Sequence, residues 1–155
     1  MALELHTAGM FVKTAPEATS GTRPTSGYTA LTSIKRIGSL NPEPNALDVT
    51  DLSDTEFKRY ILGLKDTGGA LTLGANHTES FMTEWGNLCD TADSLAAADK
   101  ALWMEIGHPK LTKSFFLRII PSPMGLNEVG VDAPLEIDVY VSPNKVAGWA
   151  AKSTT

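Results

Sequence analysis

The sequence has few of the residues on which catalytic and metal sites depend. A single cysteine, Cys89, occurs among 155 residues, so an internal disulfide framework is excluded. The three histidines, His6, His77 and His108, lie far apart and lack the spacing of a zinc site. Cys89 follows Trp85 by one turn of a predicted helix, which favours a small buried thiol over a nucleophile. We therefore expect no enzyme activity, no metal and no cofactor.

Long apolar runs and an excess of positive charge are also missing. No stretch of about 18 apolar residues occurs, so no membrane-spanning helix is expected. The formal net charge of −5 argues against a surface that neutralises nucleic-acid phosphates. The first residues show no basic segment followed by an apolar one, so no secretion signal is expected. With 42% hydrophobic residues, the chain fits one folded domain over 1–155.

Alternating patterns predict several β-strands, whereas helical spacing occurs once. The clearest strand pattern is 135–141, where aliphatic side chains alternate with Glu136, Asp138 and Tyr140. An apolar stripe at i, i+4, i+7 and i+11 predicts a helix over 79–97. The sum is a mainly β fold with one helix (α+β), a β-sandwich or β-barrel against which the helix packs. Further strands are expected at 9–13, 28–37, 46–52, 69–76, 101–107, 113–120 and 146–150.

Residues typical of turns predict three irregular segments. Prolines, glycines and serines indicate a flexible arm or loop over 14–27 and a second loop over 121–134, and 151–155 is expected to be a tail. The helix is expected to weaken at 90–93, where residues of the capping type cluster. A turn is expected at Asn144.

Segment 38–68 is a long excursion between two predicted strands. Connections longer than about 12–15 residues are uncommon in compact domains and tend to be functional. Exposed apolar side chains on such a segment would mark a partner surface, whereas folded back they would join the chain's own core. The residues leave both alternatives open. The apolar side chains in question are Leu47, Val49, Leu52, Phe57, Tyr60, Ile61, Leu62 and Leu64.

Several short pieces follow one another in a fixed order. They are Tyr28-Thr29-Ala30-Leu31, Ile37-Gly38-Ser39-Leu40, Glu43, Leu47-Asp48-Val49-Thr50-Asp51-Leu52-Ser53-Asp54, Tyr60-Ile61-Leu62-Gly63-Leu64-Lys65-Asp66 and Gly68-Gly69. In this order they resemble the tail tube (major tail) protein family of long-tailed (siphovirus-type) bacteriophages. The resemblance covers about residues 7–150 and is densest over 37–76. Relative to that family, Pro16 to Gly27 looks like an insertion.

The resemblance implies a structural protein of the virion tail, made in the host cytoplasm. Six copies would form a ring, and the loop 38–68 would reach from one ring onto the next. The stacked rings would form a passive conduit through which genomic DNA passes without specific binding. Expected partners are further copies of this chain, the tape measure protein, and the tail terminator and distal tail proteins. Glu136 and Asp138 could line the lumen, where acidic side chains repel DNA, or could lie on a solvated sheet face.

Two other function classes stay open. A tube protein of a secretion or contractile injection system would share the fold that the resemblance implies. A monomeric β-sandwich binding module would need exposed aromatic side chains on one face, for which Trp103 and Trp149 are the candidates. Asp48, Asp51 and Asp54 recur every third residue but lack the EF-hand pattern, which favours a solvated or intersubunit face over a calcium site.

Overall fold

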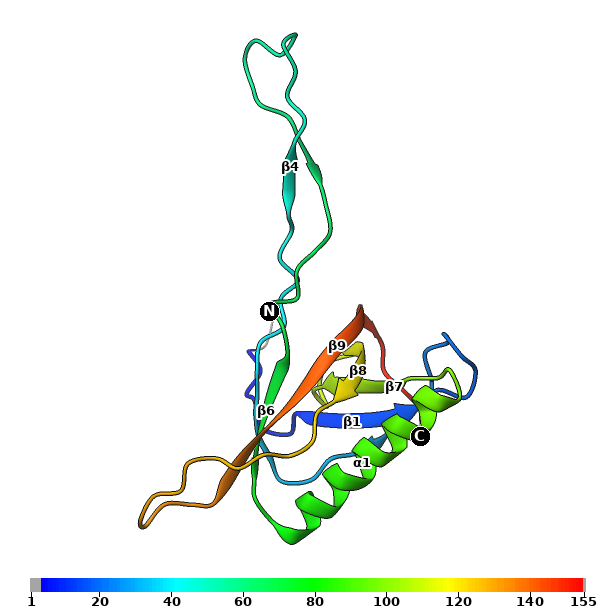
Figure 1. Ribbon diagram of the computed structural model, residues 1–155, viewed down its shortest axis with the longest axis vertical. Helices are drawn as coiled ribbons and strands as arrows, with labels where there is room; N and C mark the ends of the chain where they lie inside the picture. The colour runs from blue at the N-terminus through cyan, green and yellow to red at the C-terminus, as the bar shows by residue number, and fades with distance from the viewer. Residues whose placement is uncertain (1–3, 155) are drawn as a thin grey trace.

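Residues 4–154, which the computed structural model describes, form a curled antiparallel sheet with one helix and a projecting hairpin (Figure 1). Seven strands follow the order β2-β1-β7-β8-β9-β6-β3. The mainly β class with one helix is confirmed, and these seven strands form one curled sheet. The strands of this sheet are β1 (Phe11–Pro16), β2 (Thr29–Ala30), β3 (Ile34–Ile37), β6 (Leu71–Asn76), β7 (Leu102–Gly107), β8 (Lys113–Pro121) and β9 (Glu136–Ala151).

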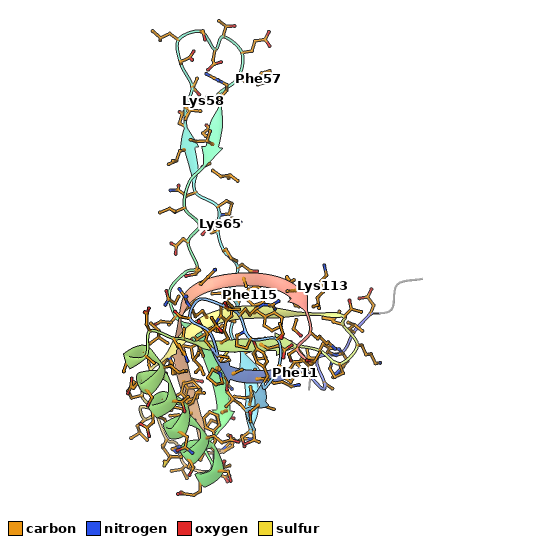
Figure 2. All side chains as sticks on the ribbon, turned by 90° about the vertical axis from the view of Figure 1, so that its right-hand side faces the viewer. Phe11, Phe57, Lys58, Lys65, Lys113 and Phe115 are labelled. Atoms are coloured by element: carbon orange, nitrogen blue, oxygen red, sulfur yellow. The ribbon has the colours of Figure 1, made fainter. Side chains whose placement is uncertain are left out.

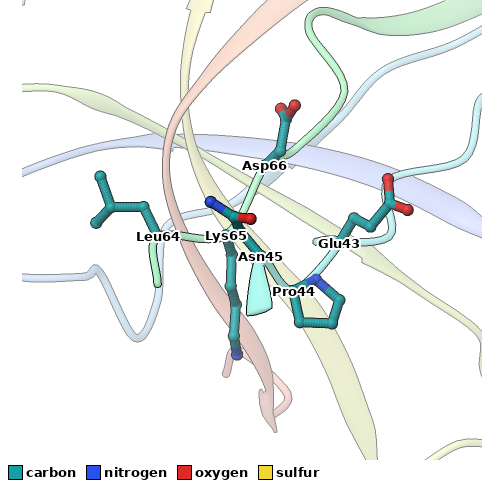
Figure 3. A pocket seen from close by; sticks show the side chains of 6 residues that line it. All are labelled: Glu43, Pro44, Asn45, Leu64, Lys65 and Asp66. Atoms are coloured by element: carbon teal, nitrogen blue, oxygen red, sulfur yellow. The ribbon is translucent and has the colours of Figure 1, made fainter. Parts of the chain in front are cut away.

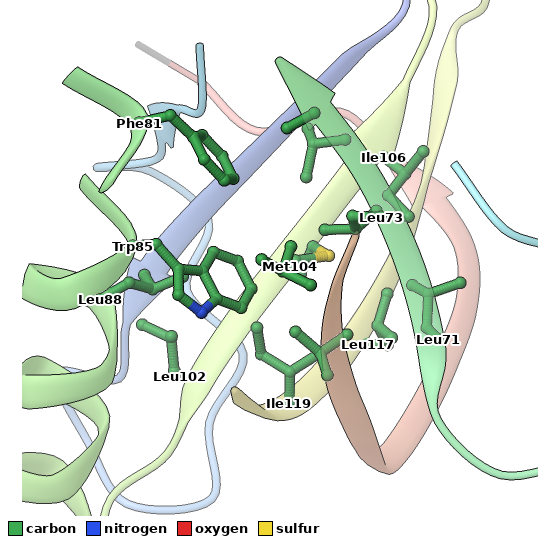
Figure 4. Close-up of a cluster of buried hydrophobic side chains, with 14 of the residues drawn as sticks. Leu71, Leu73, Phe81, Trp85, Leu88, Leu102, Met104, Ile106, Leu117 and Ile119 are labelled. Carbon is green, nitrogen blue, oxygen red and sulfur yellow. The ribbon is translucent and has the colours of Figure 1, made fainter. Parts of the chain in front are cut away.

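The helix α1 (Glu79–Ala97) packs its apolar stripe against the concave side of the sheet (Figure 4). Thr78 caps the helix by accepting a hydrogen bond from the Phe81 N–H at 3.1 Å. Phe81, Trp85 and Leu88 are buried, as their helical spacing predicts. They meet aliphatic side chains from β6, β7 and β8. Within the described residues, no helix is both long and apolar enough to cross a membrane.

The helix is continuous through 90–93, so the weakening predicted there is wrong. Ala92 and Leu95 extend the packed stripe along the core, and this tertiary contact outweighs the local preference of Asp90 and Asp93 for helix ends. Each fully buried large side chain contributes about 1.5–3 kcal/mol.

β9 is a single strand of 16 residues, so the turn predicted at Asn144 is wrong. Its first part pairs with β6 and its second part with β8. The register shifts opposite Arg118/Ile119, which leaves Asn144 without a partner between Pro143 and Lys145. Such a bulge bends a strand and increases its twist, which lets the sheet curl around the core. Ala151 belongs to this strand, so the described part of the tail predicted over 151–155 is 152–154.

The bounds predicted for the flexible arm or loop 14–27 are wrong at its start, because Thr14–Pro16 belong to β1. The rest of this segment packs on the outer face of the sheet. The indole N–H of Trp103 donates to the carboxylate of Glu17 at 3.0 Å, and both side chains are buried. Arg23 lies over the ring of Phe116, 4.2 Å from its centroid. The segment therefore covers apolar rings of β7 and β8.

Two other predicted segments differ in their bounds. In place of one strand over 28–37, β2 and β3 are separated at Ser33, whose φ of 63° interrupts extended structure. The loop predicted over 121–134 spans 122–135, since Pro121 is the last residue of β8. Its first residue is anchored, because the Ser122 N–H donates to the Tyr140 carbonyl at 2.9 Å.

Candidate functional site

Segment 38–68 leaves the body as an extended hairpin, which we name the arm (Figure 1). Its strands β4 (Ala46–Asp48) and β5 (Tyr60–Leu62) pair antiparallel, with Leu47 opposite Ile61. Within the described residues, β4 and β5 form a separate two-stranded sheet. The strand predicted over 46–52 is therefore present as β4, although it is shorter than the sequence suggested.

The arm is apolar on both faces. Residues opposite one another in an antiparallel ribbon share a face, and successive residues alternate between faces. Leu47, Val49 and Ile61 therefore lie on one face, and Tyr60 and Leu62 lie on the other.

On the first face, Gly63 leaves room for the side chain of Leu47. A Cβ added to Gly63 would lie 3.2 Å from the Leu47 side chain, which shows that Leu47 folds across the glycine. Leu47 nevertheless stays 45% exposed, because a two-stranded ribbon has no second layer behind it.

The apolar side chains of the arm are exposed, and the tip carries the most exposed of them (Figure 2). Leu52 and Phe57 are 104% and 80% exposed, and Leu62 is 71% exposed. The alternative in which this segment folds back onto its own core is therefore wrong. Exposed apolar side chains gathered on one projection are typical of a surface that a partner covers.

Polar side chains order the turn at the tip. The Arg59 guanidinium donates to Asp54 at 2.7 Å and to Asp51 at 2.9 Å. The Asp51 carboxylate also accepts from the Ser53 N–H at 2.8 Å and from the Ser53 hydroxyl. The hydrogen bonds from Ser53 are the main reason that the pKa of Asp51 lies below its usual value. Arg59 was not among the residues predicted from the sequence, although an arginine that follows two spaced aspartates across a turn is a usable signal.

Asp48 also belongs to this hydrogen-bonded turn. A hydrogen bond with the Thr50 side chain, and then the one from the Thr50 N–H at 2.9 Å, lower the pKa of Asp48. Among the described residues, no group of three or more histidine, cysteine or acidic side chains is placed to hold a metal ion. Asp48, Asp51 and Asp54 therefore stabilise the turn by accepting hydrogen bonds within it.

A small hollow lies between the two legs of the arm (Figure 3). Asn45 accepts a backbone hydrogen bond from Gly63, and Glu43 pairs with Asp66. Pro44 alone thus opposes two residues of the other leg, which is the arrangement of a β-bulge. One of those two residues is Leu64, which is 90% exposed. The bulge breaks the ladder between the foot and the middle of the arm.

Glu136 and Asp138 are ion-paired on the outer face of the sheet. Lys35 pairs with Glu136, and Arg36 reaches both carboxylates at 3.1 Å. Lys35, followed by Arg36, lowers the pKa of Glu136. Arg36 lies across Gly74, where an added Cβ would stand 2.8 Å from Nε. This cluster therefore carries two charges of each sign, a balance that sequence reasoning missed because the partners are about 100 residues apart.

The remaining sequence candidates do not converge on one site. Trp103 is 2% exposed and Trp149 is 56% exposed, so they form no exposed aromatic pair. Trp149 instead meets Phe115 edge to face, with 5.6 Å between ring centroids. Cys89 is half-buried with its sulfur 3.7 Å from the Ser122 carbonyl, and burial raises the pKa of its thiol. A raised thiol pKa disfavours the thiolate that a nucleophile needs.

Comparison with known proteins supports the fold. No family model matches the sequence, and no curated protein matches it. A chain of the anti-feeding prophage (AFP) baseplate, solved by cryo-EM and 6-fold symmetrised, has a similar structure with a TM-score of 0.60. The likeness covers 97% of this chain and 98% of that chain at 10% sequence identity. The fold of this chain is thus shared, over nearly the whole length of both chains, with a component of a phage-like baseplate.

Proposed function

We propose that this chain is a structural subunit of a phage-type tail that assembles with copies of itself through the arm. The observation that carries the proposal is the exposure of apolar side chains on both faces of a projection that its own body does not cover. The shared fold with a component of the 6-fold symmetrised AFP baseplate supports a place in such an assembly. Burial of these side chains between copies would supply the driving force.

Ring formation and stacking follow from two kinds of contact. The two edge strands of the sheet, β2 and β3, present unpaired backbone groups with which a strand of a neighbouring copy can pair. A head-to-tail contact that closes gives a ring, and a second one that does not close gives a stack of rings. In this proposal six copies form each ring, and the arm supplies the axial contact.

The finer form of the proposal is the tail tube of a long-tailed phage, as the sequence resemblance implies. The stacked rings would then conduct DNA from the capsid into the host cell. The tape measure protein would occupy the lumen before ejection, and the tail terminator and distal tail proteins would bound the tube. In this role the chain belongs to the virion and binds no DNA specifically.

The second candidate is a tube or baseplate protein of a contractile injection system, which the AFP likeness favours. A contractile system surrounds its tube with a sheath, whereas a siphovirus-type tail has none. Binding of a sheath protein to assembled tubes would therefore select this candidate. The monomeric binding module has less support, because Trp103 is buried.

Negative-stain electron microscopy of the purified full chain tests the proposal. We expect rings or tubes that form more readily as the protein concentration rises, with sedimentation confirming large particles. A chain that stays monomeric at high concentration, both alone and after mixing with tail tips that initiate assembly, would contradict the proposal.

A further inference from the structure

We infer that the loop 122–135 of one copy docks into the apolar hollow at the foot of the arm of the next copy. The inference rests on the proposed function in one respect, since both partners are copies of this chain. It names a second axial contact, separate from the exposed side chains of the arm.

The hollow lies where the arm joins the body, above β8 and β9. It is lined by apolar side chains from segments far apart in the sequence, and its volume is about 360 Å³. Trp149 forms one wall and is more than half exposed, with Phe115 beside it. Figure 2 shows Phe115 on the side of the body from which the arm rises. Met10, Leu40 and Pro42 are among the other apolar residues of the lining.

The loop 122–135 offers apolar side chains that the body does not cover. Leu126 is 82% exposed and Val131 is fully exposed. The start of the loop is held in place, because Met124 packs against the core and Asn127 exchanges hydrogen bonds with Asp138. In Figure 1 the loop, coloured yellow to orange, projects from the end of the body opposite the arm. The two apolar features thus lie at opposite ends of the body.

The charges of the two features are complementary. The loop carries Glu128 and Asp132 and no basic residue. Lys113 and Lys65 line two neighbouring hollows, which share Trp149 and Phe115, respectively, with the apolar hollow. Within residues 4–154, none of these four side chains makes an ion pair. Opposite charges around an apolar contact select the partner and fix its register.

Contact between opposite ends of identical molecules is head-to-tail and extends without closing. A second copy is therefore the occupant that both the positions and the charges favour. The arm would contact this neighbour elsewhere, since each leg spans about 40 Å at 3.3 Å per residue. Two separated contacts would fix the angle between stacked subunits, which a single contact could not do.

A charge-reversal series tests the docking. Reversal of the loop charges by Glu128→Lys with Asp132→Lys should raise the critical concentration for assembly about tenfold, as measured by sedimentation. Adding Lys65→Glu and Lys113→Glu to the same chain should restore assembly. The control is Asp90→Lys with Asp93→Lys on α1, which changes the net charge equally and should leave assembly unchanged. Circular dichroism checks that each variant is folded.

The outcomes separate this inference from the proposed function. If the natural chain assembles and the loop reversal has no effect, the docking is wrong and the tail proposal stands. The same conclusion follows if the chain with all four substitutions does not regain assembly. If the natural chain never assembles, the proposed function itself fails. If a reversal variant does not fold, Val131→Asp replaces it, because a fully exposed side chain contributes little to folding. Normal assembly by folded Val131→Asp would likewise overturn the docking.

Discussion

The Arg59 guanidinium and the Asp54 carboxylate join the two sides of the turn at the tip of the arm, with 2.7 Å between Nε and Oδ2. Arg59 also reaches Asp51, so one cation holds two carboxylates of the same turn. A projection ordered before it meets its partner loses less conformational entropy on binding. The polar tip therefore serves the apolar contact by holding Phe57 and its neighbours in a defined geometry.

The titration of Asp51 should report this ordered tip. Hydrogen bonds from Ser53, and then from Arg59 among others, lower the pKa of Asp51. A carboxylate with a lowered folded-state pKa stabilises structure above its ordinary value of about 3.9, and the contribution is lost as pH falls through the lowered pKa. We expect the Ser53 amide resonance to shift with a midpoint below about 3.9.

The control for this titration is Asp51→Asn, which should remove the shift of the Ser53 amide. A midpoint at or above the ordinary value would mean that the turn is not ordered in solution. Assembly measured between neutral pH and about pH 5 should not change through Asp51, because its carboxylate stays ionised over that window.

Two acidic substitutions on the face of the arm that carries Tyr60 and Leu62 should separate assembly from folding. Tyr60→Asp with Leu62→Asp places charges where apolar burial between copies is proposed. Both side chains are more than half exposed, so the free energy of unfolding should change by less than about 0.5 kcal/mol. Polymerisation should be lost, as seen by electron microscopy and sedimentation.

Met82→Asp is the control for placing an acidic residue at an exposed apolar position, with one added charge against two in the double variant. Met82 is a partly exposed apolar residue on α1, away from the arm, and its substitution should leave assembly intact. Normal tubes from Tyr60→Asp with Leu62→Asp would show that the anchors of the contact lie elsewhere.

The close approach of backbone at the foot of the arm predicts a sensitive glycine. The Gly38 N–H donates to the Thr72 carbonyl at 2.7 Å, and a Cβ on Gly38 would stand 2.8 Å from that same oxygen. Gly38→Ala should therefore push the arm away from β6 and cost about 1–3 kcal/mol of unfolding free energy. Gly86→Ala in α1 meets open space and should stabilise the helix by up to about 1 kcal/mol. Equal stability of the two variants, measured by chemical denaturation, would contradict this account.

The sequence predicted those parts of the structure that depend on local pattern. The stripe that starts at Phe81 predicted a helix, and the alternation around Val139 predicted a strand, because burial on one face imposes a period on the residues. The excess of apolar residues in 38–68 marked the arm as the candidate site for the same reason. These features can be read without any knowledge of the fold.

Parts of the structure that depend on contacts distant in sequence could not be predicted. Nothing local indicates that Lys35 meets Glu136, or that Glu17 accepts a hydrogen bond from Trp103. The prediction at Asn144 failed because a bulge and a turn favour similar residues. Only the pairing of β8 with β9 distinguishes the two.

The ion pairs around Glu136 lead to a test of which face lines the lumen. Glu136→Gln with Asp138→Asn would leave Lys35 and Arg36 without their carboxylates and give the face two uncompensated positive charges. If this face lines the tube, these charges would contact DNA phosphates, and assembled variant tubes should retain short duplex DNA at low salt and release it as salt rises. Natural tubes should retain less DNA, because Lys35 and Arg36 are already paired with Glu136 and Asp138. The matched control is Glu79→Gln with Asp90→Asn on α1, which makes the same change in net charge at a position outside the sheet face. Variant tubes that form normally and bind no more DNA than this control would place Glu136 and Asp138 away from the lumen.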